Sequence, residues 1–203
     1  MVSVRMLMMA ATAVVLTTGG TAWAGAPTDQ LRGRVDRVLR ALEDPELKPE
    51  ARAVERRASI RVIVAEIFDF RDLSQRALGP HWQGRTAGER DEFIQLFADL
   101  LERSYIDKIE LYSGAERIQY TGELLDGDQV ATVRTRIVTK QGTEIPVDYR
   151  MRRVGADRWL VYDVAIEGVS LVANYRAQFN RIIRRSSYKG LVEQLTARLA
   201  SQR

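Results

Sequence analysis

The chain has 203 residues, a formal net charge of +4 and no cysteine. This length suits a single domain that can enclose a core or a cavity, and the lack of cysteine excludes disulfide cross-links. The 31 basic residues are scattered among 27 acidic ones, so the composition excludes the basic tract that is typical of nucleic-acid binding.

The first 24 residues have the pattern of a secretory signal peptide. Arg5 precedes an apolar run over residues 6–16, and Ala22-Trp23-Ala24 matches the small-residue cleavage motif. The run is shorter than a membrane span requires. We therefore predict cleavage after Ala24 and export of one soluble domain, residues 25–203. The alternative is an uncleaved N-terminal anchor, and attachment through a lipid-modified cysteine is not expected.

Helical periodicity and capping signals predict helices on both sides of a central block of strands. Thr28 is predicted to cap the first of them. In the longest one, Thr86 and Glu89 have the spacing of a capping box. An apolar stripe follows at helical spacing, and we expect it to lie on the sheet; it comprises Phe93, Leu96, Phe97, Leu100, Leu101 and Tyr105. The predicted helices cover residues 29–42, 50–68, 70–78, 86–111, 170–185 and 188–202.

Alternating side chains between residues 118 and 166 predict four antiparallel strands with one apolar and one polar face. In the central hairpin, a three-residue loop ending at Gly142 keeps the two faces separate. It puts Ile137 opposite Ile145 on the apolar face. On the polar face it puts Arg134 opposite Asp148. The predicted apolar face carries Ile118, Tyr120, Leu124, Ala131, Val133, Thr135, Ile137, Ile145, Val147, Tyr149, Met151, Leu160, Tyr162, Val164 and Ile166.

These elements predict an α+β fold, in which a four-stranded antiparallel meander packs against N- and C-terminal helices. Strands gathered in one block argue against alternating β-α-β units. The apolar face, the stripe of the long helix and the segment Val169, Leu171 and Val172 are expected to converge. Two interpretations stay open, a solid core or an apolar cavity between sheet and helices, because cores and ligand pockets use the same residue types.

Residues with catalytic potential are few. The sequence has no phosphate-binding loop or metal-ligand cluster, and its one histidine, His81, is expected in a turn after Gly79-Pro80. Asp148 and Asp163 are the carboxylates available for acid-base chemistry, but the predicted register turns Asp148 toward solvent. Ser170 lacks the second glycine of a hydrolase elbow and is placed to cap a helix. We predict no enzymatic activity, no metal and no cofactor.

Arginines gather in two places that are candidates for steering the protein toward acidic proteins or anionic membrane surfaces. One group lies on the polar face of the sheet and the other in a late helix; for each, the alternative is a merely solvated surface. The groups are Arg134, Arg136, Arg150 and Arg152, and Arg181, Arg184 and Arg185.

Ordered motifs across the chain carry a resemblance to a known family. They are Phe68-Asp69-Phe70, Leu78-Gly79-x-x-Trp82, Phe93-x-x-x-Phe97-x-x-Leu100-Leu101-x-x-x-Tyr105, Ile145-Pro146-Val147-x-Tyr149-Arg150, Trp159-x-Val161-Tyr162-Asp163-Val164 and Glu167-Gly168-Val169-Ser170-Leu171. From residue 34 to residue 199 the chain resembles the MlaC, or toluene-tolerance, family of periplasmic phospholipid-binding proteins. Residues 101–105 and 140–144 also resemble relatives associated with hopanoid biosynthesis.

The resemblance implies a soluble, monomeric carrier that binds phospholipid acyl chains between sheet and helices and leaves the head group in solvent. It implies exchange of lipid with an inner-membrane MCE-protein/ABC-transporter complex and an outer-membrane lipoprotein complex. The lipid-binding residues are then predicted to be Phe97, Leu101, Tyr105, Ile137, Ile145, Val147, Tyr149, Met151, Val164, Ile166, Val169, Leu171 and Val172. The alternatives are a carrier of a hopanoid-type lipid, a small exported enzyme that uses the same pocket, and a periplasmic adaptor with a solid core.

Overall fold

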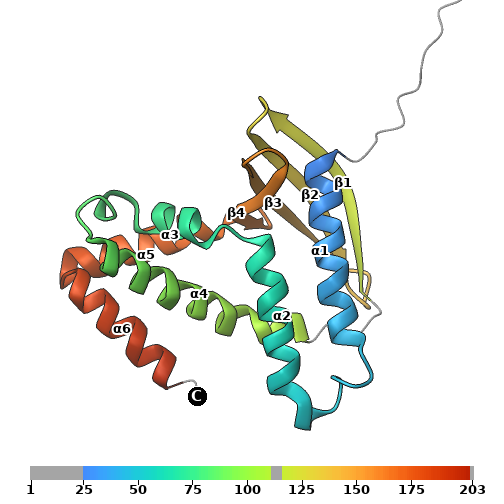
Figure 1. Ribbon diagram of the computed structural model, residues 1–203, viewed down its shortest axis with the longest axis horizontal. Helices are drawn as coiled ribbons and strands as arrows, with labels where there is room; N and C mark the ends of the chain where they lie inside the picture. The colour runs from blue at the N-terminus through green and yellow to red at the C-terminus, as the bar shows by residue number, and fades with distance from the viewer. Residues whose placement is uncertain (1–24, 111–115, 202–203) are drawn as a thin grey trace, which may run out of the picture.

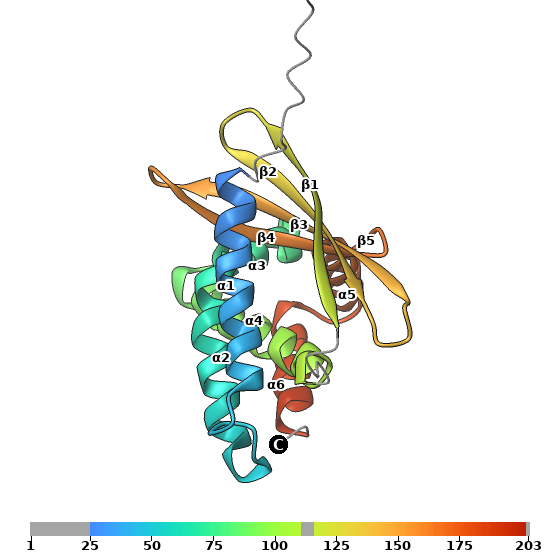
Figure 2. The ribbon, with the colours of Figure 1, turned by 90° about the vertical axis from the view of Figure 1, so that its right-hand side faces the viewer.

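The structure, a computed structural model, describes residues 25–110 and 116–201. An antiparallel sheet carries helices α1 and α2 along one face, and helices α3 to α6 form a second group that meets the sheet at strand β4 (Figures 1 and 2). The predicted α+β class is therefore confirmed. The predicted signal peptide, residues 1–24, lies outside the described residues.

The elements follow one another in the predicted order. The helices are α1 (Ala26–Glu43), α2 (Ala53–Ile67), α3 (Phe70–Leu78), α4 (Ala87–Glu110), α5 (Leu171–Arg185) and α6 (Tyr188–Ala200), with short 3₁₀ turns at Glu50–Arg52 and Gly79–His81. The strands are β1 (Arg117–Asp126), β2 (Val130–Val138), β3 (Glu144–Val154), β4 (Arg158–Ile166) and β5 (Val169–Ser170).

The sheet has five strands in the order β1-β2-β3-β4-β5, so the prediction of four strands was wrong. The additional strand is short and pairs Val169 with Ile166 across a two-residue turn. Both turn residues, Glu167 and Gly168, have positive φ angles of 51° and 80°. This is the backbone twist that tight hairpins favour. Ser170 ends the strand and also caps α5, because its side chain accepts a hydrogen bond from the Ala173 amide.

The central hairpin has the predicted register, with Ile137 opposite Ile145 and Arg134 opposite Asp148. Its loop closes through a hydrogen bond from the Gly142 amide to the Thr139 carbonyl, and Gly142 has a φ of 80°. Glycine adopts this left-handed conformation without the steric cost that a side chain would add.

Two bulges correct the predicted apolar face. In β1 the pairing skips Thr121, so Leu124 pairs with Thr132 on the polar face and is 51% exposed. In β4 the pairing skips Tyr162, so Val161 and not Leu160 lies beside Met151. A bulge adds one residue to a strand and reverses the faces of all residues beyond it. Leu124, Leu160 and Tyr162 were therefore predicted on the wrong face.

The first helix begins earlier than predicted, at Ala26, with Pro27 in its first turn. Thr28 is not the cap. It is buried instead, and both its amide and its hydroxyl donate hydrogen bonds to Glu123 Oε2, at 2.9 and 2.6 Å. The first β-bulge turns Glu123 toward α1, since Glu123 pairs with the fully buried Val133. This contact fixes the start of α1 on the sheet.

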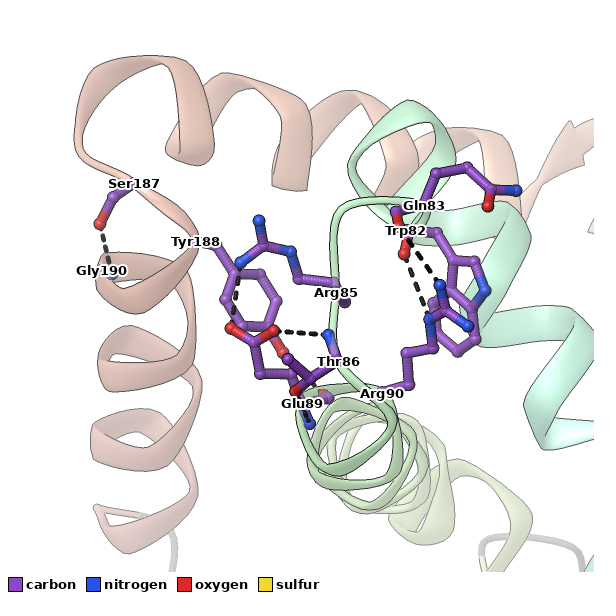
Figure 3. A network of polar contacts seen from close by, with 9 residues as sticks. All are labelled: Trp82, Gln83, Arg85, Thr86, Glu89, Arg90, Ser187, Tyr188 and Gly190. Atoms are coloured by element: carbon purple, nitrogen blue, oxygen red, sulfur yellow. Dashed lines mark hydrogen bonds and ion pairs between the residues drawn. The ribbon is translucent and has the colours of Figure 1, made fainter.

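The predicted capping box at the start of α4 is confirmed (Figure 3). The Glu89 amide donates to Thr86 Oγ1 over 3.2 Å, and the Thr86 amide donates to Glu89 Oε2 over 2.8 Å. The Tyr188 hydroxyl donates to the Glu89 carbonyl, and the Arg85 guanidinium lies 4.5 Å from the centre of the Tyr188 ring. These contacts join the start of α4 to the start of α6.

The buried side chains form two clusters. The sheet cluster joins the apolar face to α1 and α2, and the helical cluster joins α3, α4, α5 and α6. The stripe of α4 therefore does not lie on the sheet as predicted: Phe93 and Phe97 pack against Phe179 of α5, with ring centres 5.6 and 5.2 Å apart. From the end of α4, Ile106 and Ile109 reach the sheet cluster.

Candidate functional site

The apolar face of the sheet is covered more completely at one end than at the other. At the covered end, Ala131, Met151 and Val161 are at most 1% exposed. At the opposite end, which we call the open end, the side chains are equally apolar but only partly buried; they are Ile118, Ile137, Ile145 and Ile166. The register places Ile118, Ile137 and Ile145 side by side across three strands.

Helices α1 and α2 are anchored at the covered end. Gln30 Oε1 accepts a hydrogen bond from the Trp159 amide over 3.0 Å, and Arg34 Nη1 donates to the Trp159 carbonyl over 2.7 Å. The Asp69 amide, just after α2, donates to the Val161 carbonyl over 2.9 Å. From these anchor points the two helices run side by side past the sheet (Figure 1).

The end of α4 and the start of α5 approach the sheet cluster from the side. Ile106 and Ile109 of α4 and Leu171 of α5 belong to it or pack against it. The end of α4 is held to α2 by Glu110, whose Oε1 lies 3.0 Å from Arg56 Nη2 and whose Oε2 lies 2.7 Å from Arg57 Nη2. Burial acts to raise the pKa of Glu110. The hydrogen bonds from Arg57 and Arg56 outweigh this effect, so the pKa of Glu110 is lowered.

Two tyrosines place phenol groups within this apolar region. Burial raises the pKa of Tyr149 to about 12, and burial together with the neighbouring Tyr149 raises the pKa of Tyr120. The Tyr120 hydroxyl is buried and has no hydrogen-bond partner among the described residues, while its ring lies 4.5 Å from the Arg32 guanidinium. A buried hydroxyl without a partner costs about 1–3 kcal/mol, so this phenol is a donor available to a ligand that carries an acceptor.

The site therefore combines a partly covered row of aliphatic side chains with few polar groups. A family model described as MlaC protein matches residues 32–197. The chain belongs to the MlaC family. The match covers both the sheet and the helices that surround the open end.

Two relatives of known description support the MlaC assignment. The intermembrane phospholipid transport system binding protein MlaC of Haemophilus influenzae is 29% identical over 100 residues, which is 48% of this chain and 46% of that protein. The chain thus aligns with about half the length of this curated relative. A solved phospholipid-binding protein from Ralstonia solanacearum, in complex with a phospholipid, matches with a TM-score of 0.76 and 26% identity, over 88% of this chain and 99% of that one.

The MlaC-family structure divides the predicted lipid-binding residues between the two clusters. Eight lie together in or against the sheet cluster: Ile137, Ile145, Val147, Tyr149, Met151, Val164, Ile166 and Leu171. Three belong to or pack against the helical cluster: Phe97, Leu101 and Val172. Tyr105 lies near Tyr175 of the helical cluster. Burial is the larger cause of the raised Tyr105 pKa, and the neighbouring Tyr175 adds to it. Val169 is 60% exposed on β5.

Sequence reasoning missed the contributions of the first two helices and of the end of α4. Leu31, Val38 and Leu42 of α1 and Ile60, Ile63 and Ile67 of α2 are buried in the sheet cluster. Their helical periodicity was visible, but periodicity does not tell which helix covers which face. The enclosed cavity expected between sheet and helices stays a prediction.

The residues considered for catalysis have structural partners. Asp163 is 3% exposed and accepts hydrogen bonds from Arg150, from Ser170 and from the Val172 amide, at 2.9, 2.6 and 3.1 Å. His81 Nε2 lies 2.9 Å from Asn180 Oδ1. Over residues 25–110 and 116–201 there is no cluster of potential metal ligands and no helix that is both long and apolar enough to cross a bilayer.

Proposed function

We propose that this MlaC-family protein is a periplasmic phospholipid carrier. The acyl chains enter at the open end of the apolar face and lie between the sheet, α1, α2 and the end of α4. The head group stays in solvent. The observation that carries this proposal is the row Ile118, Ile137 and Ile145, partly buried in a fold whose solved relative holds a phospholipid.

The free-energy barrier that such a carrier has to lower is large. Each buried CH₂ group contributes about 0.8 kcal/mol, so a two-chain lipid does not leave a membrane for water at a useful rate. A protein that keeps the chains in an apolar environment lowers this barrier. The open end offers such an environment, because Ile137, Ile145 and Ile166 are partly buried and pack against the sheet cluster, as do Ile109 of α4 and Leu171 of α5.

The description of the Haemophilus relative as a binding protein of an intermembrane phospholipid transport system supports movement of lipid between two membranes. The carrier takes lipid between an inner-membrane MCE-protein/ABC-transporter complex and an outer-membrane lipoprotein complex. The predicted signal peptide supports a periplasmic location. A carrier in that compartment lies between the two complexes.

The test is organic extraction of the protein purified from the periplasm, followed by mass spectrometry of the extract. We expect phospholipid in stoichiometric amount. Hopanoid in place of phospholipid would identify the alternative cargo. A folded protein without any lipid would contradict the carrier and support an adaptor with a solid core.

A further inference from the structure

A polar groove of about 790 Å³ lies between α3, α5 and the polar face of the sheet, on the side away from the apolar face. Its walls include Arg76 and Gln75 of α3, Arg150 of β3, and Arg176 and Arg184 of α5. Trp82 and Gln83 also line the groove, and Figure 3 shows both residues. The groove is thus rich in side-chain hydrogen-bond donors.

The carboxylates of the groove are already neutralised by neighbouring cations. Asp72 pairs with Arg76 at 3.0 Å and with Arg152 at 3.2 Å. Asp163 pairs with Arg150 at 2.9 Å, and its side chain is only 4% exposed. These ion pairs also engage Arg150 and Arg152, and Arg136 pairs with Glu144 at 2.9 Å, so three of the four arginines predicted as a basic surface on the sheet have acidic partners.

The cations of α5 are different. From residue 171 to residue 192 the sequence has four arginines and one lysine but no acidic residue. Arg176 and Arg184 are exposed, line the groove two turns apart, and form no ion pair within the described parts of the chain. Arg181 and Arg185 add two further exposed charges to the same helix. The groove therefore has a net positive wall without a partner for its charge.

We propose that this groove docks an acidic segment of a partner protein. The planar guanidinium group binds carboxylates through paired hydrogen bonds, and two such groups eight residues apart match carboxylates spaced along a peptide. A membrane surface fits less well, because membrane-binding helices need apolar side chains beside their cations. The large apolar side chains that are exposed lie on other elements, at Val54, Val62, Leu124, Leu125 and Val169.

The position of the groove connects docking to lipid transfer, and this link rests on the proposed carrier function. The groove reaches Ser170 and Val172, the neighbours of Leu171, which packs against the sheet cluster. A partner segment in the groove therefore contacts the residues on either side of Leu171 in the chain. Docking there would bring the partner's lipid-binding surface close to the open end.

The test uses a fluorescent octaglutamate peptide as the probe and anisotropy as the readout, at low and at physiological ionic strength. The groove variant is Arg176→Glu/Arg184→Glu. The matched control is Arg40→Glu/Arg198→Glu, which changes the net charge equally at two exposed helical positions outside the groove. We expect salt-dependent binding by the wild type, a loss of about tenfold or more in the groove variant, and a change of about twofold or less in the control.

Three results would overturn the proposal: no binding of the peptide by the wild type, an equal loss in both variants, or groove-dependent binding of phosphatidylglycerol vesicles without binding of the peptide. Lipid content is measured on the same preparations by extraction. A wild type that binds the peptide but contains no lipid refutes the carrier function and leaves the groove assignment standing. A wild type that contains lipid but does not bind the peptide refutes the groove assignment and leaves the carrier function standing.

Discussion

Ile137 lies directly opposite Ile145 across the central hairpin, at the end of the apolar face that the helices leave partly open. The two side chains are only partly buried, although Ile137 has an isoleucine opposite it in both adjacent strands, Ile118 in β1 and Ile145 in β3. In the proposed carrier this pair contacts the acyl chains.

A charge at the open end should abolish lipid binding with little loss of folding. We predict that Ile145→Asp purifies as a folded protein with little phospholipid, because acyl chains do not tolerate an unpaired carboxylate while water still reaches this position. The measurements are lipid phosphorus per protein and a thermal melt. The control is Leu124→Asp, at an exposed apolar residue on the polar face. Equal lipid content in the two variants would contradict the site.

Removal of the Tyr120 hydroxyl should not destabilise the lipid-free protein. Because this hydroxyl is buried without a partner, Tyr120→Phe is expected to leave the free energy of unfolding unchanged or to raise it by about 1 kcal/mol. Urea unfolding of the delipidated protein measures this change. A loss of more than about 1 kcal/mol would mean that the hydroxyl has a stabilising partner in the folded protein.

The contact between Thr28 and Glu123 should be important for stability. Thr28→Val removes the hydroxyl donor from a partly buried hydrogen bond to a carboxylate, which is worth about 1.5–3 kcal/mol. We expect a loss of this size in urea unfolding. Thr121→Val serves as the control, since Thr121 is exposed and lies in the bulge of β1, the strand that carries Glu123. Similar losses in both variants would show that the contact does not anchor α1.

Acid should loosen the junction of α2 and α4 through Glu110. The pKa of Glu110 is lowered in the folded protein, so its contribution to stability is complete above the unfolded pKa of about 4.3 and is lost as pH falls through the lower folded value. Glu110→Gln removes this ionisation. We expect the stability difference between wild type and variant to shrink from neutral pH to below about pH 4. A difference that is constant over this range would contradict the assignment.

The sequence allowed accurate prediction where the signals are local. Thr86 and Glu89 identified a helix start, and Gly142 with the alternation around it identified the register of Ile137 and Ile145. The bulges at Thr121 and Tyr162 were not predictable, because the pairing of two distant strands decides where an extra residue is accommodated.

Tertiary relationships were predicted less well than local ones. The stripe of α4 satisfies its periodicity equally against a sheet or against other helices, and Phe97 in fact packs on Tyr175 and Phe179. The choice depends on α1 and α2, which cover the apolar face of the sheet and are held there by hydrogen bonds of Thr28, Arg34 and Asp69. The fifth strand was missed because Glu167 is not a typical residue for a positive φ.

In the proposed carrier, phospholipid chains lie at the open end of the apolar face. The most direct measurement is photo-crosslinking of the purified protein loaded with a phospholipid that carries a diazirine in one acyl chain, followed by peptide mapping. We predict crosslinks on the β2–β3 hairpin near Ile137 and Ile145, on Ile166, and on the end of α4 near Ile109. Crosslinks confined to exposed apolar residues elsewhere, such as Val54 and Val62 of α2, would contradict the account.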